Sequence, residues 1–450
     1  MKKVLLFISS LVFFISFQDV ACPQIITDIK ISSSPNPVGS GARATGMGGA
    51  FIAIADDATA ASWNPGGLIQ LETPEVSIVG SCDISRDDYD SESHPEASGM
   101  NEITRYDLNY FSIAYPFQFA SKNMVVSLNY QKLYDMNKNM DFNVINTGRL
   151  PGFPQYKIRD KVRFRQRGSL KALSPAYAIQ ITPRFSVGAT FNIWTDELFW
   201  DNDWTANTDE TFSGIGVTGT TYRNKRTRKE SFSHFKGFNM NFGFLWDINP
   251  AITVGAVFKT PFNASLSYRY KETQKVYQPA IGSIITSRIE FSEHRELKMP
   301  MSYGLGMAVR LSDILTISFD VYRTNWSRFF MEDKDNHDTS PITGAPRRHS
   351  HVHDTTQVRI GGEYLLMLEK TIIPLRAGLF YDPQPSQKHP DDFFGFSLGS
   401  GIMLKKHILL DWAYQMRYGH NVCGGSLGGI SDAKADIIQH KLMLSMIYHF

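Results

Sequence analysis

Residues 408–418, ILLDWAYQMRY, show the pattern that decides the fold of this chain. The even-numbered positions, such as Leu410 and Trp412, are apolar or aromatic, whereas the odd-numbered positions, such as Asp411 and Gln415, are mostly polar or small. An alternation with a period of two residues is typical of a β-strand whose two faces meet different surroundings. We therefore predict a strand here with one apolar face.

The same alternation recurs along most of the chain after residue 74. In residues 315–323, for example, apolar residues alternate with Thr, Ser, Asp and Tyr. Fourteen segments can be interpreted in this way, which predicts an all-β protein. The predicted strands are residues 75–84, 106–117, 122–136, 161–181, 184–200, 228–246, 251–272, 288–311, 314–331, 355–368, 371–382, 392–404, 407–419 and 436–450.

The connections between these strands alternate in length. Every second connection is short, such as residues 182–183 and 312–313, whereas the others are long, such as residues 137–160, 201–227 and 273–287. Short turns at one end, long loops at the other and an even strand number are typical of an antiparallel barrel of the bacterial outer membrane. A soluble β-sandwich or propeller would not explain the alternating loop lengths. The terminal aromatic residue of the chain also fits the end of an outer-membrane barrel.

The composition agrees with a membrane barrel. Aromatic residues make up 13% of the chain and charged residues 20%, and the net charge is +2. After residue 20 no apolar run approaches the roughly 20 residues that a membrane helix needs. The near-neutral charge gives no reason to expect nucleic acid as a partner. At the N-terminus, Lys2 and Lys3 precede an apolar run over residues 4–17, which predicts an export signal over residues 1–21.

Between the signal and the first strand lies a segment without the period of a strand. Its central part, residues 39–68, is rich in Gly and Ala. Because fourteen strands enclose more lumen than their own side chains fill, we predict that residues 22–74 form a hatch inside a barrel of residues 75–450. A disordered periplasmic leader is the alternative, but large residues such as Phe51 and Trp63 argue against it.

Several short blocks resemble one known family. Residues 55–58, ADDA, and residues 63–68, WNPGGL, are similar to the N-terminal hatch of the outer-membrane long-chain fatty acid transporters (FadL/TodX-like). Further matching blocks are residues 258–262, 299–306, 320–327 and 376–383. The resemblance implies a fourteen-stranded barrel, plugged by the hatch, that passes hydrophobic molecules from outside towards the membrane.

The resemblance also assigns candidate gating residues. They are Asp56, Asp57, Asn64, Pro65 and Gly66. The family has Asn-Pro-Ala in the hatch where this chain has Asn-Pro-Gly. We expect the glycine to loosen that turn, so that the hatch rearranges more readily.

A hydrophobic substrate needs an apolar groove at the outer surface. In the resembling family the groove is made by the loops after the fifth and seventh strands. The corresponding candidates here are Trp200, Trp204, Phe212, Tyr277, Ile281, Ile284 and Ile285. The three isoleucines have helical spacing within a predicted loop, and we expect them to form an apolar lip. Packing of one loop on another is the alternative for each of these residues.

Two basic clusters invite a functional interpretation. Arg163, Arg165 and Arg167 share one face of a predicted strand, which we expect to be the lumen face, and they are candidate contacts for a ligand head group. Pairing with hatch acids such as Asp56 is the alternative. The second cluster, within residues 223–229, lies in or near a predicted outer loop, where the phosphates of lipopolysaccharide are the expected partner.

The remaining expectations concern chemistry and assembly. Cys82 and Cys423 would be neighbours at the seam between the first and last strands, and we predict a disulfide between them. No nucleophile and base are arranged as in an enzyme, and we expect neither a cofactor nor a metal. We predict a monomer in the outer membrane that passes hydrophobic molecules, first of all long-chain fatty acids, by passive hatch-gated diffusion. A component or shuttle of a secretion system, or a general porin, is the alternative.

Overall fold

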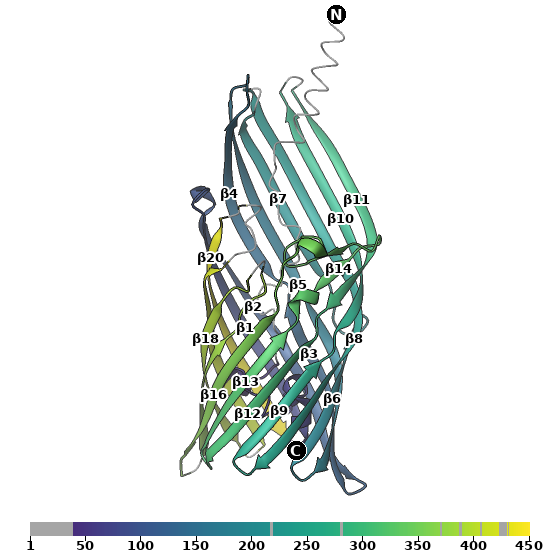
Figure 1. The fold of residues 1–450 in the computed structure, drawn as a ribbon, viewed down its shortest axis with the longest axis vertical. Helices are drawn as coiled ribbons and strands as arrows, with labels where there is room; N and C mark the ends of the chain where they lie inside the picture. Colours follow the sequence, from purple (N-terminus) through teal and green to yellow (C-terminus); the bar gives the residue numbers. More distant parts are fainter. Residues whose placement is uncertain are drawn as a thin grey trace, which may run out of the picture.

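A closed ring of antiparallel strands forms the body of the molecule (Figure 1). The structure is a computed structural model, and it describes residues 39–216, 219–279, 282–369, 371–386, 389–405, 407–422, 430 and 432–450. Within these residues fourteen strands form the ring, as the alternation predicts, and β20 pairs with β1 to close it. None of the helices in this part of the chain is long and apolar enough to cross a membrane.

Each predicted strand overlaps one strand of the ring. In order around it these are β1 (Glu75–Asp90), β2 (Gly99–Phe119), β3 (Lys122–Asp135), β5 (Gln155–Thr182), β6 (Phe185–Trp194), β8 (Thr221–Asn249), β9 (Ile252–Lys259), β12 (Ser302–Ser312), β13 (Leu315–Thr324), β16 (Thr355–Met367), β17 (Ile372–Tyr381), β18 (Phe393–Leu404), β19 (Ile408–Val422) and β20 (Lys434–His449). The predicted short turns all lie at the end of the barrel where the chain ends, which is the periplasmic end in barrels of this kind.

A second group of strands rises beyond the ring on one side (Figure 1). The strands are β4 (Lys138–Arg149), β7 (Trp204–Ile215), β10 (Phe262–Gln278), β11 (Ser283–Met299), β14 (Phe330–Glu332) and β15 (Asp338–Thr339). They pair with one another and with the outer halves of β5 and β8. We call this group, with the outer halves of β5 and β8, the outer sheet.

The outer sheet corrects the prediction of long loops over residues 137–160, 201–227 and 273–287, which are mostly strand. Three predicted strands, 251–272, 288–311 and 314–331, are also wrong in their extent, because each spans parts of one strand of the ring and one of the outer sheet. In the first two, proline residues lie at the break, Pro261 and Pro300. Proline has no N–H for the strand ladder, so a strand tends to end there.

The two faces of the ring differ as the alternation predicts. On β19, Trp412 is 47% exposed on the outer face, whereas its neighbour Asp411 is 3% exposed and points inward. Large apolar side chains are exposed on the outer face of strand after strand. Lipid replaces water around this band, so its exposure costs nothing in a membrane.

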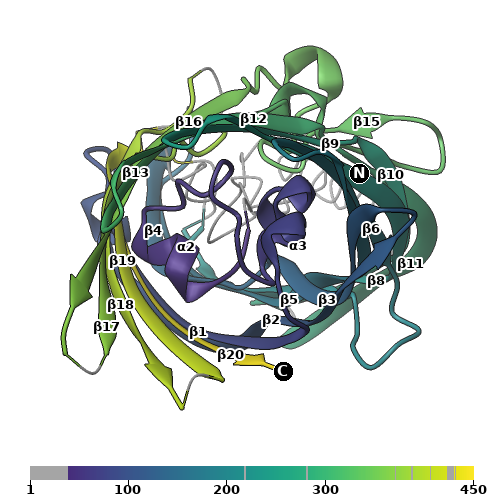
Figure 2. The same cartoon turned by 90° about the horizontal axis from the view of Figure 1, so that it is seen from below.

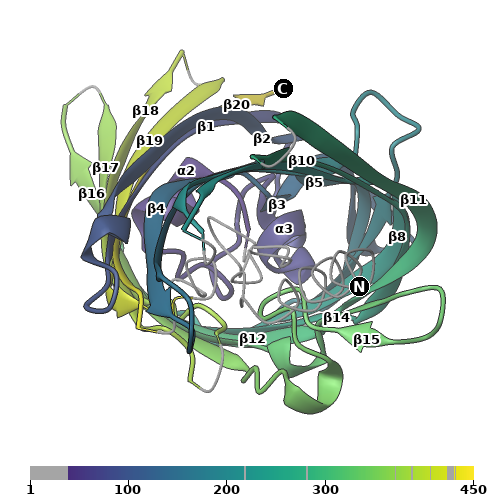
Figure 3. The same ribbon diagram turned by 90° about the horizontal axis from the view of Figure 1, so that it is seen from above.

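Residues 39–74, which we call the inner segment, lie within the ring (Figures 2 and 3). This segment contains α2 (Ala42–Gly46), α3 (Ala60–Trp63) and the 3-10 helix η1 (Pro65–Gln70). Its apolar side chains form a buried cluster with inward-facing residues of several strands. Three further 3-10 helices, η2 (Pro95–Ala97), η3 (Trp326–Arg328) and η4 (Arg347–His349), lie in the longer connections. The predicted signal and the first part of the predicted hatch lie outside the described residues.

Candidate functional site

Asp320 of β13 holds the middle of the inner segment. One of its carboxylate oxygens accepts hydrogen bonds from the amides of Phe51 and Ile52, at 2.7 and 2.9 Å. The side chain is fully buried. A carboxylate that accepts two amide hydrogen bonds away from bulk water fixes the backbone that donates them. The sequence offered one signal for this role, which is a single acid among the small and apolar residues of a ring strand.

A chain of buried charges links α2 to the barrel wall. The guanidinium of Arg43 donates to both carboxylate oxygens of Glu363, at 3.1 and 2.9 Å. Glu363 also accepts from Arg376 at 2.5 Å, and Arg376 donates to Asp411 at 2.5 Å. These residues come from α2, β16, β17 and β19. Removing one member would leave another charge buried without compensation, so the network locks the inner segment against the wall.

The predicted gating turn is bound to the wall on the other side of the lumen. The amide group of Asn64 donates to the carbonyl oxygens of Ile52 and Phe244, both at 2.8 Å. Its side-chain oxygen accepts from the amide of Gly66 at 3.1 Å. Ser186 donates to the carbonyl oxygen of Gly66 at 2.9 Å. The turn therefore touches β6, β8 and another part of the inner segment at once.

The remaining predicted gating residues have local partners. Asp56 forms an ion pair with Arg43 at 2.6 Å, and Asp57 accepts hydrogen bonds from the amide and hydroxyl of Thr59. Pro65 begins η1 and is buried. Asp56 and Asp57 thus stabilise the inner segment itself, and within the described residues neither forms an ion pair with the arginines at 163–167.

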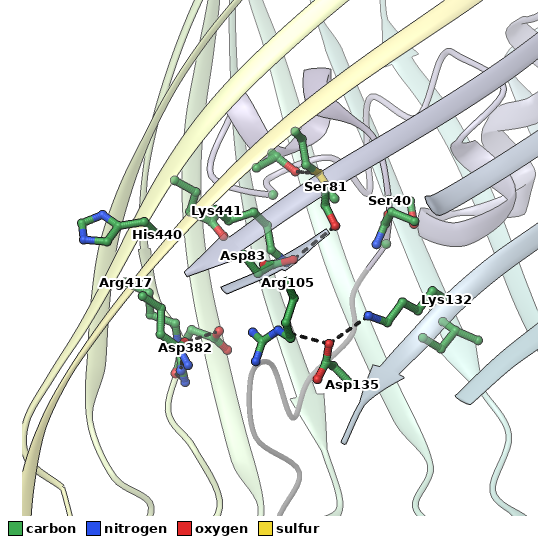
Figure 4. A pocket seen from close by; sticks show the side chains of 18 of the residues that line it. Ser40, Ser81, Asp83, Arg105, Lys132, Asp135, Asp382, Arg417, His440 and Lys441 are labelled. Atoms are coloured by element: carbon green, nitrogen blue, oxygen red, sulfur yellow. Dashed lines mark hydrogen bonds and ion pairs between the residues drawn. The ribbon is translucent and has the colours of Figure 1, made fainter. Parts of the chain in front are cut away.

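Above the inner segment the lumen holds a charged cavity of about 120 Å³ (Figure 4). Its cations all face acids. Arg105 and Lys132 approach Asp135, at 3.3 and 2.8 Å. The other pairs are Lys441 with Asp83 at 3.4 Å, Arg417 with Asp382 at 3.2 Å and Arg359 with Asp382 at 3.8 Å. Paired charges of this kind suit water in a lumen and offer little to an apolar molecule.

A second feature of the interior is a row of aromatic side chains that runs from the outer sheet into the barrel. The ring centres of successive residues lie 4.6–6.4 Å apart, and we call these residues the aromatic row. In order they are Tyr270, Phe291, Tyr268, Phe232, Trp204, Phe235 and Trp194, with Phe262 and Tyr134 on either side of Trp194. The rings of Phe232, Trp204, Phe235 and Trp194 are buried and pack on one another in one apolar cluster of the interior. The row begins at an outer cavity of about 280 Å³.

The inner end of the row is a small cavity of about 40 Å³ beside Lys259. Tyr134, Trp194 and Phe262 line it together with Trp326. The ammonium of Lys259 lies 5.8 Å from the ring centre of Tyr322 and 3.4 Å from the carbonyl oxygen of Ser62 in α3. The sequence analysis missed Lys259, although it lies in the quoted block at residues 258–262. Its inward parity on a strand that is otherwise apolar could have drawn attention to it.

The predicted groove residues separate into different places. Trp204 is 1% exposed within the aromatic row, and Phe212 is buried further out on β7. Trp200 instead packs edge to face on Tyr130 at 4.9 Å.

The predicted apolar lip also needs correction. Ile284 and Ile285 are exposed neighbours on β11, so their side chains point to opposite faces of a strand and not along one face of a helix. They lie opposite Tyr277 and Val276 of β10, near the tip of that hairpin. Ile281 lies outside the described residues.

The predicted head-group arginines face away from the lumen. Arg163 and Arg167 are exposed on the outward face of β5, and Arg165 is half-buried there. Arg163 and Arg165 pair with Asp141 at 3.6 and 2.6 Å, and Arg167 donates to Asn139 at 2.7 Å. The lumen interpretation was wrong because the inward positions of this stretch are the even ones, Val162 and Phe164 among them.

The predicted disulfide involves a residue outside the described part of the chain. Cys82 lies on β1 opposite Leu442 of β20, and it is a free thiol there. Cys423 is not among the described residues. Its neighbour Val422 lies opposite Ala435, seven residues along β20 from the level of Cys82. This register weighs against the pairing, which stays a prediction.

The fold and the site define the class of protein. A closed fourteen-stranded ring with an apolar outer band belongs to an outer-membrane β-barrel, and this one encloses an inner segment from the N-terminal part of the chain. The model of one family, described as outer membrane protein transport protein (OMPP1/FadL/TodX), matches residues 38–423. The chain therefore belongs to this family of Gram-negative outer-membrane transport proteins.

Solved structures agree on the fold. A FadL homologue from Pseudomonas aeruginosa has 14% identity and a TM-score of 0.58, with 92% of this chain and 98% of that chain covered. The toluene transporter TodX of Pseudomonas putida has 12% identity and a TM-score of 0.56 with the same coverage. The toluene transporter TbuX of Ralstonia pickettii has 14% identity and a TM-score of 0.54, with 92% and 99% covered. No curated protein sequence matches the chain.

Proposed function

We propose that this protein admits hydrophobic small molecules that carry a carboxylate, with long-chain fatty acids as the first candidates, by passive diffusion across the outer membrane. The observation that carries the proposal is the aromatic row, which connects the outer cavity with Lys259. Family membership supports transport but leaves the ligand open.

The aromatic row supports an apolar ligand. Its rings lie on the inward face of the outer sheet and on ring strands, and Trp204, Phe232 and Phe235 are each less than 5% exposed. A molecule that enters at the outer cavity can exchange water for aromatic contact before it reaches the barrel. Removal of apolar surface from water contributes about 25 cal/mol for each Å², which is enough to draw a long acyl chain inward.

Lys259 supports a carboxylate at the end of that chain. Its ammonium lies beside a cavity inside the barrel that aromatic rings line together with the amides of Asn192, Asn239 and Asn241, and a cation away from bulk water is worth more to an anion than one in water. A neutral hydrocarbon such as toluene, which the names of two similar structures mention, gains nothing from it. Lys259 thus favours a fatty acid over a neutral aromatic ligand. The neutral aromatic ligand is the second candidate.

The inner segment acts as the hatch in this proposal. The cavity beside Lys259 holds only about 40 Å³, so a fatty acid needs a rearrangement to pass. Lys259 contacts the carbonyl oxygen of Ser62, two residues before Asn64. A carboxylate that draws the ammonium away from Ser62 weakens one hold on α3. Ligand arrival and movement of the Asn64–Gly66 turn are thereby coupled, and no energy source is needed.

The test compares fatty acid and neutral ligands on two variants. Palmitate binding to the purified barrel is measured by quenching of Trp fluorescence, with methyl palmitate and toluene beside it. We expect Lys259→Met to weaken palmitate binding about 10- to 100-fold, because a hydrogen bond to a charged group contributes about 1.5–3 kcal/mol. Binding of methyl palmitate and toluene should stay the same.

Lys271→Met is the matched control, because Lys271 is an exposed lysine on β10 that lies outside the aromatic row. Equal losses in both variants would contradict a head-group role for Lys259. Toluene binding that exceeds palmitate binding in the wild type would favour the aromatic hydrocarbon. Steady conductance of salts and sugars without any ligand effect would favour a general porin, and co-purified secretion components without bound lipid would favour a secretion shuttle.

A further inference from the structure

The outward face of the outer sheet carries many more basic than acidic side chains. The basic residues are Lys157, Arg159, Lys161, Arg163, Arg165, Arg167, Arg223, Lys225, Lys229, Arg269, Lys271, Lys275 and Arg288, and all but Arg165 are exposed. The acids that lie among them are Asp141, Asp209 and Glu290. This face is independent of the aromatic row, which lies on the inward face of the same strands.

Like charges stand opposite one another where β8 pairs with β10. Lys225 is in register with Lys275, and Lys229 is in register with Lys271. Like charges directly across a strand pair are destabilising, so the sheet accepts a cost here. Lys271 reaches Glu290 at 3.3 Å, but no ion pair of the described chain engages Lys225 or Lys275. An anion bound between them would remove the cost.

Neighbouring residues extend the cluster of lysine pairs both along β8 and β10 and across the sheet to β7 and β5. Between the two lysine pairs, Thr227 lies opposite Thr273. Thr273 adds a hydroxyl donor, whereas the hydroxyl of Thr227 donates to Asp209 at 3.1 Å. Towards β5, Thr211 of β7 is in register with both Lys161 and Lys225. Strands lie about 4.8 Å apart, so Lys161 is about 10 Å from the level of Lys225. A ligand with several phosphates fits this spacing better than a single phosphate does.

The height of the cations on the barrel indicates where the phosphates come from. On β5 the outward face changes from Arg167 to the apolar Leu173 and Tyr177. On β8, Phe238 and Phe242 of the lipid-facing band are 51% and 43% exposed, and they follow Lys229 along the same strand. The basic face therefore begins directly above the band that lies in the hydrocarbon, at the level of the lipid head groups.

We infer that this face binds the phosphate groups of lipopolysaccharide, the lipid that surrounds an outer-membrane barrel in its outer leaflet. The lysines that carry the contact are Lys161, Lys225, Lys229, Lys271 and Lys275, with the hydroxyls of Thr211 and Thr273 between them. Bound lipopolysaccharide fixes the outer sheet upright on the membrane and keeps the outer cavity at the end of the aromatic row open to the outside. This binding does not depend on which ligand the barrel transports.

The experiment measures how tightly purified protein in detergent binds bisphosphorylated lipopolysaccharide, at two salt concentrations. The test variant replaces Lys225, Lys229, Lys271 and Lys275 by Gln together. We expect its dissociation constant to rise at least about tenfold, because each lysine near an anionic lipid surface contributes measurably to binding. We also expect a smaller dependence on salt. Lipopolysaccharide stripped of its phosphates should bind both proteins equally weakly.

The matched control replaces four basic residues near the periplasmic turns, Lys122, Arg184, Arg310 and Lys405, by Gln, and it should bind as the wild type does. The heat-dependent shift in electrophoretic mobility checks that each barrel is folded. If the fourfold variant fails to fold, the double variant Lys225→Gln with Lys275→Gln replaces it in the binding measurement. An unchanged dissociation constant in the folded test variant would overturn the inference. Binding of heparin as tight as that of lipopolysaccharide would overturn the choice of ligand.

Discussion

Gly66 lies so close to the backbone of β8 that a methyl group has no room there. A Cβ atom at this position would approach the Cα of Phe244 to 2.8 Å and the carbonyl oxygen of Gly243 to 3.0 Å. The sequence interpretation attributed looseness to the glycine, whereas its contacts indicate close packing. The neighbouring Asn64 completes the contact with its two hydrogen bonds across the turn. The predicted gating turn is therefore closely packed against the wall.

Gly66→Ala distinguishes the two interpretations. Overpacking against backbone costs about 1–3 kcal/mol, so we expect a lower midpoint in urea unfolding and a higher ion conductance in planar bilayers. A glycine that only loosens the turn would give the opposite result, with a more stable barrel after substitution. Gly99→Ala is the control, because nothing lies within 4 Å of a Cβ built there.

Strand β5 shows how one element serves two environments. Its odd-numbered side chains point outward along its whole length, as Arg163 does above the membrane and Tyr177 within it. The sequence interpretation assigned the arginines to the lumen and needed a change of parity near Ala172. No such change occurs, because the same outward face passes from water to lipid. The even-numbered face of the outer half buries Asp160, which has no exposed surface.

Asp160 makes the outer sheet sensitive to pH. Burial and the charge of Glu210 raise the pKa of its carboxyl from the usual 3.8 to about 7, although Arg226 opposes the shift. The folded sheet therefore holds a proton that the unfolded chain releases. Its stability is highest below about pH 4, falls by about 1.4 kcal/mol for each pH unit as this proton is lost, and levels off above about pH 7.

We expect hydrogen exchange of β7 amides to become faster from pH 5 to pH 7 beyond the intrinsic increase, and Asp160→Asn to remove that extra increase. Asp209→Asn should keep it, because Asp209 lies on the outward face of the same sheet. Identical pH profiles in the wild type and Asp160→Asn would contradict the assignment.

Across the whole molecule, the inner segment is held at opposite sides of the lumen by different chemistry. Hydrogen bonds and close packing hold the Asn64 turn against β6 and β8, whereas ion pairs hold α2 against β16 and β17. Asp320 holds the middle. A rearrangement of the Asn64 turn can therefore leave the Arg43 side anchored.

Glu363→Gln tests the anchored side. Its carboxylate balances Arg43 and Arg376, so the substitution leaves two buried guanidiniums with less compensation and costs about 3–5 kcal/mol. We expect large, steady conductance in planar bilayers, because the inner segment loses its anchor. Asp83→Asn removes an acid from the charged cavity without touching the Arg43 network, and it should conduct as the wild type does. Equal conductance of both variants would exclude an anchoring role for this network.

The sequence by itself determined the strands of the ring, their number and the lipid-facing side of strands such as β19. Each strand lies between two environments, so local alternation such as Asp411 beside Trp412 records both. The tertiary structure alone decided the rest. Ring closure brings Asp320 to the amides of Phe51 and Ile52, which lie far away in the chain. Pairing with the outer halves of β5 and β8 turns the predicted loops into strands. The same pairing decides that Arg163 points outward to water. A local sequence pattern could not predict either result, because it does not say which strand will be the partner.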